Sequence, residues 1–262
     1  MALFTRGILL SVLIGLAGCA SAPVDPAARQ ALAPTGKLRV AVYPGSPTSM
    51  IKDAKSGETR GVTWDLGRAL AASLGVPFEP VEFARPAEIV EGLKAGKADV
   101  TFTNASPARA RDLDFSRALV SIEQGFLVPA GSKLAKADEV DRPGVRVGVT
   151  AGSTSEGLLS RQVKHLTLVR ARNVQEAASL LSSGSIEAFA TNKAILAELS
   201  DRVPGSRILE GRFGVENQAL GIPKGRDAGL PFLRRFAEHA LADGTVQKAV
   251  ERAGVRGTSK PD

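Results

Sequence analysis

Short apolar runs of strand length alternate with segments of helical periodicity along most of the chain, and no other feature constrains the fold as much. Residues 38–42 form the first run, and residues 63–74 carry leucines four residues apart before Gly75 stops the helical pattern. The segments that follow are a strand at 81–83, a helix at 86–95 and a strand at 100–102. This order predicts a mostly parallel sheet covered by helices.

The same order repeats in the second half of the chain. Strand-like runs lie at 145–149, 166–170 and 188–190. Ser153 and Asn173 each stand three residues before a glutamate, which is the capping-box spacing, and Asn192 opens a third helix. Residues 227–253 are predicted to be mostly helical, with an interruption at Gly244. We therefore expect two α/β halves of about a hundred residues each, with a ligand cleft at the carboxyl ends of their strands.

The charge pattern argues against a nucleic-acid partner. The formal net charge is +7, and one of those positive charges, Arg6, lies in the leader. The rest of the chain carries 33 basic and 27 acidic side chains, a balance of +6, without a block of five like charges. Basic stretches interleaved with aromatic residues are also absent from the sequence. Such a surface attracts anions only mildly.

The N-terminus has the features of an export signal. An apolar run over residues 7–16 follows Arg6 and is too short to span a bilayer comfortably. The sequence Leu16-Ala17-Gly18-Cys19 resembles the bacterial lipoprotein box, which implies a signal peptide over 1–18 and a lipidated Cys19. A free thiol after an ordinary cleavage site is the alternative. Residues 19–36 are expected to form a lipidated, flexible tether that holds the protein to a membrane outside the cytoplasm.

Six short motifs occur in a fixed order in the body of the chain. They are residues 38–41, 61–66, 93–99, 106–109 with 114–116, 148–156 and 184–188. Ser106-Pro107-Ala108-Arg109 followed by Asp114-Phe115-Ser116 is the most specific of them. Together they resemble the family 3 solute-binding proteins, clamshell receptors that deliver polar amino acids and related solutes to ABC importers. The resemblance covers residues 38–254.

This resemblance implies a type II periplasmic-binding-protein clamshell, an α/β fold of two doubly wound lobes joined by two crossing strands. Lobe 1 would be discontinuous, over 37–122 and 219–262, and lobe 2 would cover 123–218. The crossing strands are expected near 122–124 and 218–222. Capture of a ligand would close the lobes about that hinge.

The resemblance also implies that an arginine holds a carboxylate of the solute. Spacing to the following motif favours Arg109, whereas spacing from the preceding motif favours Arg111. Guanidinium is planar, always charged and binds carboxylate through two parallel hydrogen bonds. Ser153 and Thr154 would face it from lobe 2, at a helix N-terminus that favours anions. Ser153 is also expected to cap that helix.

Other expected contacts depart from the family pattern. Thr103 and Asn104 follow a strand and either line the site or form a polar turn. Asn192 stands where the family grips an ammonium group with an aspartate, and Ser46 stands where an aromatic ring often stacks. Trp64 is either core or a ligand platform. These departures suit a carboxylate with a neutral or weakly polar remainder, or a modified amino acid, as well as an ordinary α-amino acid.

Three functions remain open on the sequence. The first is a monomeric, lipid-anchored binding protein that serves an ABC permease and ATPase, without covalent chemistry. The second is an enzyme similar to cyclohexadienyl dehydratase, for which Glu123, Glu216 and Asp65 are the candidate acids. The third is an orphan sensor or accessory lipoprotein. His165 and His239 are not placed for catalysis, and the sequence has no metal-ligand spacing and suggests no cofactor.

Overall fold

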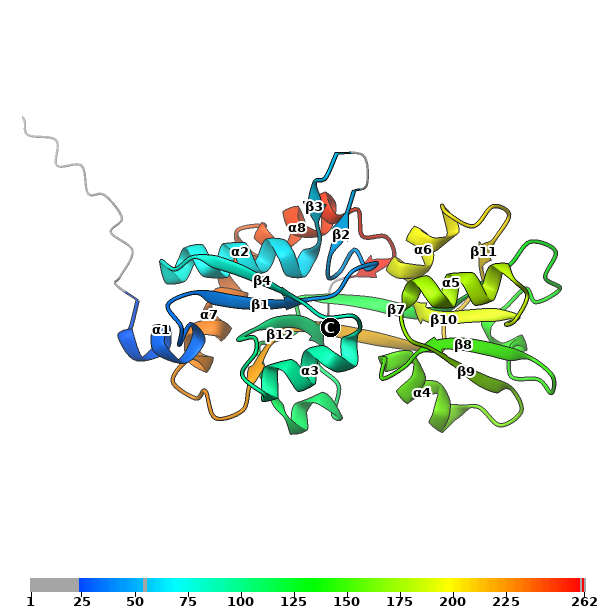
Figure 1. Ribbon diagram of the computed structural model, residues 1–262, viewed down its shortest axis with the longest axis horizontal. Helices are drawn as coiled ribbons and strands as arrows, with labels where there is room; N and C mark the ends of the chain where they lie inside the picture. Colours follow the sequence, from blue (N-terminus) through cyan, green and yellow to red (C-terminus); the bar gives the residue numbers. More distant parts are fainter. Residues whose placement is uncertain (1–23, 54–55, 260, 262) are drawn as a thin grey trace, which may run out of the picture.

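The first half of the chain folds into a parallel sheet with helices on both faces (Figure 1). The structure, a computed structural model, describes residues 24–53, 56–259 and 261. The elements of this half are β1 (Leu38–Val42), α2 (Val62–Leu74), β4 (Phe78–Glu82), α3 (Pro86–Lys94) and β5 (Thr101–Asn104). Strand β1 pairs in parallel with β4, and the Ala41 N–H donates to the Val100 carbonyl on its other side at 2.8 Å. Leu66, Leu70 and Leu74 of α2 are fully buried on one face of this sheet, as their spacing predicts.

The second half repeats this architecture (Figure 1). Its elements are β8 (Arg146–Thr150), α4 (Thr154–Gln162), β9 (Thr167–Ala171), α5 (Val174–Ser182), β10 (Ala188–Asn192) and α6 (Lys193–Ser200). Strand β8 is parallel to both β9 and β10. The three predicted helix caps are confirmed, because the side chains of Ser153, Asn173 and Asn192 accept backbone N–H bonds at 3.2, 2.9 and 3.1 Å.

Two long strands connect the halves. β7 (Val120–Val128) and β12 (Gly214–Pro223) run antiparallel, in a ladder from Gly214 opposite Gln124 to Gln218 opposite Val120. Beyond this ladder β7 pairs with β10, and β12 pairs with β5. The second crossing therefore lies at residues 214–218, about four residues earlier than the sequence predicts, because the chain from Gln218 onward already belongs to the first sheet.

The C-terminal helices return to the first half. α7 (Leu230–Ala242) and α8 (Thr245–Ala253) are separated at Gly244, as predicted, and α8 packs on α2. Their apolar residues share one core with β1 and α2, while other clusters lie between the second sheet and its helices. The remaining short elements are β2 (Ile51–Lys52), β3 (Thr59–Arg60), η1 (Arg109–Arg111), β6 (Leu113–Phe115), η2 (Ala137–Glu139), β11 (Arg207–Ile208) and β13 (Thr258–Ser259).

Part of the expected tether is instead a helix. α1 (Pro26–Leu32) begins after Asp25, whose side chain accepts the Ala27 N–H at 2.9 Å, and it lies beside α7 (Figure 1). Leu32 is fully buried against this helix pair. The prediction of a flexible tether is thus wrong for these residues, because Ala28, Leu32 and Ala33 are buried and the Arg226 guanidinium donates to the Ala31 carbonyl at 3.1 Å, which together hold the segment to the rest of the fold. The signal peptide over 1–18 and Cys19 lie outside the described residues.

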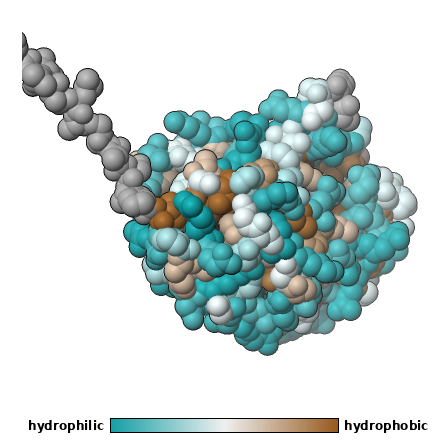
Figure 2. All heavy atoms as spheres, turned by 60° about the vertical axis from the view of Figure 1, so that its left-hand side comes forward, coloured by the Kyte–Doolittle hydropathy of each residue, from teal (hydrophilic) through white to brown (hydrophobic). Residues whose placement is uncertain are grey.

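The described surface is largely polar. Figure 2 shows one face on which hydrophilic residues predominate and hydrophobic residues are scattered between them. Val215 is the single large hydrophobic residue classed as exposed in the part of the chain that the structure describes. Within that same part, no helix is long and apolar enough to cross a bilayer, and no group of three or more His, Cys, Asp or Glu side chains is arranged to hold a metal ion.

Candidate ligand-binding site

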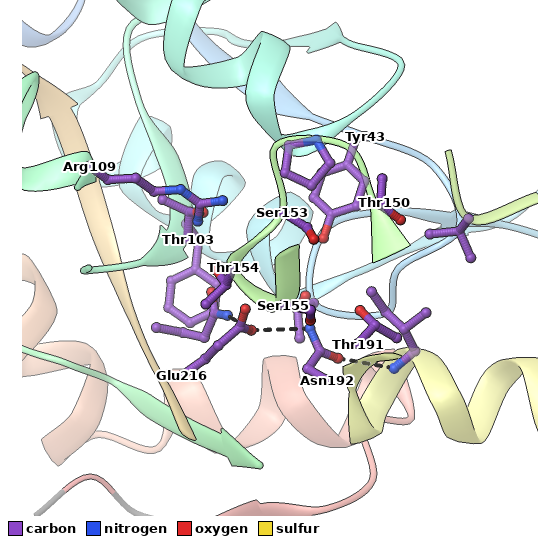
Figure 3. A pocket seen from close by; sticks show the side chains of 16 residues that line it. Tyr43, Thr103, Arg109, Thr150, Ser153, Thr154, Ser155, Thr191, Asn192 and Glu216 are labelled. Atoms are coloured by element: carbon purple, nitrogen blue, oxygen red, sulfur yellow. Dashed lines mark hydrogen bonds between the residues drawn. The ribbon is translucent and has the colours of Figure 1, made fainter. Parts of the chain in front are cut away.

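A small cavity lies between the two halves, beside the crossing strands (Figure 3). Its volume of about 30 Å³ has room for about two or three water molecules, so the two halves are closed on each other. The polar residues that line it are Tyr43, Thr48, Thr103, Arg109, Thr150, Ser153, Thr154, Ser155, Thr191, Asn192, Glu216 and Gln218. Several of them follow or end strands β1, β5, β8 and β10. The carboxyl ends of both sheets thus meet here, as expected for open α/β sheets.

Arg109 brings a positive charge to this cavity from η1, the turn after β5. Its guanidinium donates to the Thr103 hydroxyl, and Figure 3 shows it directed from the wall toward the cavity. No carboxylate among the described residues forms an ion pair with it. Burial lowers the pKa of Arg109, while the charge of Glu216 opposes this shift, and an arginine stays protonated throughout. Arg111 is exposed and donates to the Ala108 carbonyl at 3.3 Å, so Arg109 is the arginine at the cavity.

The N-terminus of α4 faces the cavity from the other half. Ser153 caps this helix, and the Thr154 hydroxyl accepts a 3.2 Å hydrogen bond from the Asn104 amide. Asn104 does not line the cavity itself but an adjoining groove, and its bond to Thr154 joins the two halves. Thr150, at the end of β8, is 3% exposed, and its hydroxyl lacks a protein partner. The cavity wall therefore offers an unused hydroxyl beside a helix N-terminus, both suited to an anionic or polar solute.

Glu216 places a carboxylate in the same cavity from the crossing strand β12. It is 6% exposed, and its Oε2 accepts hydrogen bonds from the Gln218 amide at 2.8 Å and the Asn192 amide at 3.2 Å. The Asn192 Oδ1 accepts the Ile195 N–H, which caps α6. Like Arg109, Glu216 forms no ion pair with any described residue. The cavity thus contains one cation and one anion that do not pair with each other.

Two predicted site residues lie away from the cavity. Ser46 is fully buried behind it, with its hydroxyl 2.8 Å from that of Thr48. Trp64 packs edge-on against Phe78, with ring centroids 5.1 Å apart, in the core of the first half. Neither residue lines the cavity, and of the two alternatives for Trp64 the structure favours packing against the core, because Trp64 lies on the face of α2 that covers the sheet. Tyr43 is the aromatic residue of the cavity, and burial raises the pKa of its phenol.

The structure brings together Arg109, Thr103, Ser153, Thr154 and Asn192 from the predicted set. Sequence reasoning missed Thr150 and Gln218 and considered Glu216 only as a catalytic acid. The signal for Thr150 was its position at the end of a strand. Glu216 and Gln218 lie two residues apart on β12, so both side chains point to the same face of the strand. This spacing could be recognised only after the crossing strand had been located at residues 214–218.

Two α/β halves that close over a buried polar cavity beside an antiparallel strand pair define a clamshell solute-binding protein. The chain belongs to the bacterial extracellular solute-binding proteins, family 3, whose model matches residues 38–254. Its location is accordingly extracellular or periplasmic. The glutamine-binding protein GlnH of an ABC transporter of Bacillus subtilis is 24% identical over 206 residues, which are 77% of this chain and 75% of that protein.

Solved structures confirm the predicted type II clamshell. A solute receptor for L-cysteine from Neisseria gonorrhoeae is 23% identical, with a TM-score of 0.77 over 87% of this chain and 92% of that one. The ancestral amino acid-binding protein AncCDT-1, a precursor of cyclohexadienyl dehydratase, is 27% identical, with a TM-score of 0.74 over 85% of this chain and 97% of that one. The recognised family and the fold class therefore both agree with the sequence prediction.

Proposed function

We propose that this protein is the lipid-anchored receptor of an ABC importer and captures a small carboxylate-bearing solute, an amino acid or a related compound, by closing its lobes. Lobe 1 comprises residues 37–122 and 219–262, and lobe 2 comprises residues 123–218. The observation that carries the proposal is the unpaired Arg109 guanidinium in a closed cavity between the lobes. Arg109 is partly buried, and a partly buried charge without a counter-charge costs free energy that a bound anion recovers.

In this proposal both lobes hold the solute carboxylate. Arg109 binds it through two parallel hydrogen bonds, Thr103 orients the guanidinium, and the N-terminus of α4 at Ser153 and Thr154 supplies backbone N–H donors from the other lobe. Because the two lobes grip one group, binding favours the closed conformation. The bond from Asn104 to Thr154 forms only when the lobes are together and adds to that preference.

The partners follow from the family. Two relatives are named as binding proteins of ABC transporters, so we propose that a permease and an ATPase receive the solute. The lipoprotein box at Cys19 would keep this protein, as a monomer, at the membrane surface where that permease lies. Metabolic labelling with a clickable fatty acid, lost in Cys19→Ser, tests the anchor.

The first test is thermal unfolding of residues 20–262 with a panel of amino acids, dicarboxylates, hydroxy acids, aromatic carboxylates and prephenate. A solute at a hundred times its dissociation constant adds about 2.7 kcal/mol of stability. Arg109→Ala should weaken binding by about 2–5 kcal/mol, because it removes one partner of a charged pair that the bound solute and the closed lobes cover. Arg111→Ala is the matched control and should keep the affinity, since Arg111 is exposed. Unchanged binding in Arg109→Ala would overturn the assignment.

A second candidate function has one observation in its favour. Glu216 is a buried acid in the cavity, and AncCDT-1 is described as a precursor of a dehydratase. Yet the amides of Asn192 and Gln218 both donate to its Oε2, so this oxygen already serves as a hydrogen-bond acceptor, whereas a general acid must donate a proton from its own oxygen. We therefore expect no turnover of prephenate. Aromatic product detected by its absorbance, and lost in Glu216→Gln, would establish the enzyme instead.

A further inference from the structure

An ion pair joins the two lobes away from the cavity. Arg60, on β3 of lobe 1, pairs with Glu198, on α6 of lobe 2, with 2.9 Å between Nη2 and Oε1. The two side chains are mostly shielded from water, with 28% and 14% of their surface exposed. We propose that this pair, with the C-terminal segment over residues 254–259, forms a latch that favours the closed conformation and sets the affinity without touching the solute. This inference rests on the proposed function, capture by closing of the lobes.

Arg60 has a fixed position on lobe 1. Its Nη1 donates to the Ala253 carbonyl at the end of α8. Strand β3 is held to the same helix, because Arg252 donates to the Thr59 carbonyl at 3.1 Å and pairs with Glu58 at 2.9 Å. The Arg60 guanidinium therefore moves with the core of lobe 1 and presents its second amino group to lobe 2.

Glu198 lies on a part of lobe 2 that would move when the lobes open. Ala194, at the start of α6, packs into the same apolar cluster as Val246 and Val250 of α8, so this end of α6 lies at the junction of the lobes. Glu198 follows four residues later, which is about 6 Å farther along the helix axis. Rotation of lobe 2 about the crossing strands would displace Glu198 from Arg60 more than it displaces Ala194. The ion pair therefore belongs to the closed conformation.

The segment after α8 provides a second link to α6. Figure 1 draws it in red between these two helices (Figure 1). Arg256 of this segment pairs with Asp201 at the end of α6 at 2.6 Å, and residues 258–259 form β13, which pairs with residues 121–122 of the crossing strand β7. Most of the segment lies beyond residue 254, where the match to the family model ends. This link is therefore a feature of this chain and lies outside the family pattern.

The two links differ in strength. The side chains of Arg256 and Asp201 are 51% and 65% exposed, and exposed ion pairs contribute little because water and salt screen them. The pair of Arg60 and Glu198 is more buried and is therefore the stronger link. Glu198 also pairs with Arg202 on its own helix, at 3.4 Å. It thus keeps a counter-charge when the lobes open, so the latch can break without leaving an isolated carboxylate.

The first test is the affinity of Arg60→Gln and of Glu198→Gln, measured by calorimetric titration. The probes are the two compounds of the thermal panel that give the largest shifts. Each variant should bind about three- to tenfold more weakly, because the apparent affinity falls with the population of the closed conformation. The factor should be the same for both probes, since neither residue touches them. The double variant should bind no more weakly than either single variant, because only one interaction is lost.

Two controls separate the latch from ion pairs in general. Arg146→Gln removes a pair within lobe 2, where Arg146 lies 2.6 Å from Glu187, and should leave the affinity unchanged. Arg256→Gln should lose less than about twofold, since its pair is exposed. Stopped-flow kinetics should show faster dissociation in Arg60→Gln with little change in association, because the latch forms only after the lobes have closed.

X-ray scattering from the solute-free protein gives a readout that depends on no solute. The radius of gyration should be larger in Arg60→Gln and Glu198→Gln than in the unaltered protein and in Arg146→Gln. Unchanged affinities, or a loss for one probe alone, would overturn the latch and leave the carboxylate receptor intact. If no panel compound binds, the proposed function fails, and the radii alone decide: larger radii support the latch and equal radii overturn it. Should Arg60→Gln fail to fold, Glu198→Gln decides.

Discussion

At the scale of single residues, Asp99 holds lobe 1 together. It is fully buried, and its carboxylate accepts from Arg39 Nε and Nη2 at 2.9 and 2.7 Å and from Arg226 Nη1 at 2.9 Å. The bond from Asp99 raises the pKa of Arg39. Arg226 also donates to the Ala31 carbonyl at 3.1 Å, so one carboxylate links the start of the sheet to α1 and the C-terminal region.

Replacing Asp99 should therefore be costly. Asp99→Asn leaves two largely buried arginines without their counter-charge, and we expect a loss of about 3–5 kcal/mol in the free energy of unfolding. Urea unfolding followed by circular dichroism measures it. Asp138→Asn, at an exposed aspartate, should change stability by less than about 0.5 kcal/mol. A similar small change in Asp99→Asn would show that the cluster does not stabilise the fold.

Asp141 gives lobe 2 a pH-dependent contact. Its carboxylate accepts backbone N–H bonds from His165, Lys164 and Leu166 at 2.8, 2.9 and 3.0 Å, and the bonds from His165 and Lys164 hold the pKa of Asp141 below its ordinary value. A depressed pKa adds stability that is present above about pH 4, the ordinary aspartate value, and is lost as the pH falls through the lower folded value.

We therefore expect acid to destabilise the protein partly through Asp141. The free energy of unfolding should decrease below about pH 4, and it should decrease less steeply in Asp141→Asn, which has no charge to lose. Urea unfolding between pH 5 and about pH 2.5 measures both slopes. Parallel slopes in the two proteins would mean that these three hydrogen bonds do not depend on the charge of the carboxylate.

At the scale of elements, α1 is the part of the fold whose role the sequence misjudged. Leu32 inserts between α1 and the start of α7, where its side chain approaches Gly229 closely. Leu32→Ala should cost about 2–5 kcal/mol in the free energy of unfolding, because it leaves a cavity in a packed core. Gln30→Ala, on the exposed side of α1, is the control and should have little effect. If the two variants are equally stable, Leu32 does not hold α1 to the fold, and the segment behaves as the flexible tether that the sequence predicts.

The other elements differ from their predictions mainly at the ends. Helices with a side-chain cap, such as α4 and α5, begin where the sequence places them, because the cap is a local hydrogen bond. Strand β12 could not be read from the sequence over its full length. The polar side chains of Glu216 and Gln218 become buried only because these residues pair with β7, and pairing between distant segments leaves no local signal.

At the scale of the whole molecule, Gly152 lies at a close contact between the two lobes. It lies at the start of α4 with a φ of +73°, and a Cβ there would lie 2.4 Å from the Ala87 Cβ of α3, in the opposite lobe. Gly184 has a similar φ of +69° but nothing within 4 Å of the same position. Both alanine variants carry the same backbone strain, and only one of them obstructs closure.

Gly152→Ala should therefore weaken solute binding by about tenfold or more, since a clash of this kind costs about 1–3 kcal/mol. Gly184→Ala should lose a similar amount of stability and keep its affinity. X-ray scattering with and without the best solute of the panel provides the second readout, because the radius of gyration should fall on binding in Gly184→Ala and less so in Gly152→Ala. Equal affinities would mean that capture does not need this contact.

The sequence by itself determined the two α/β halves and their helix caps and limited the carboxylate-binding candidates to Arg109 and Arg111, because periodicity, capping and motif spacing are local properties of a chain. Tertiary structure decided the rest. Arg109 lines the cavity and Arg111 does not. Ser46 and Trp64 also lie outside the cavity, whereas Glu216 lines it. The physical reason is that burial and pairing depend on segments about a hundred residues apart, such as β5 and β12, meeting in one register.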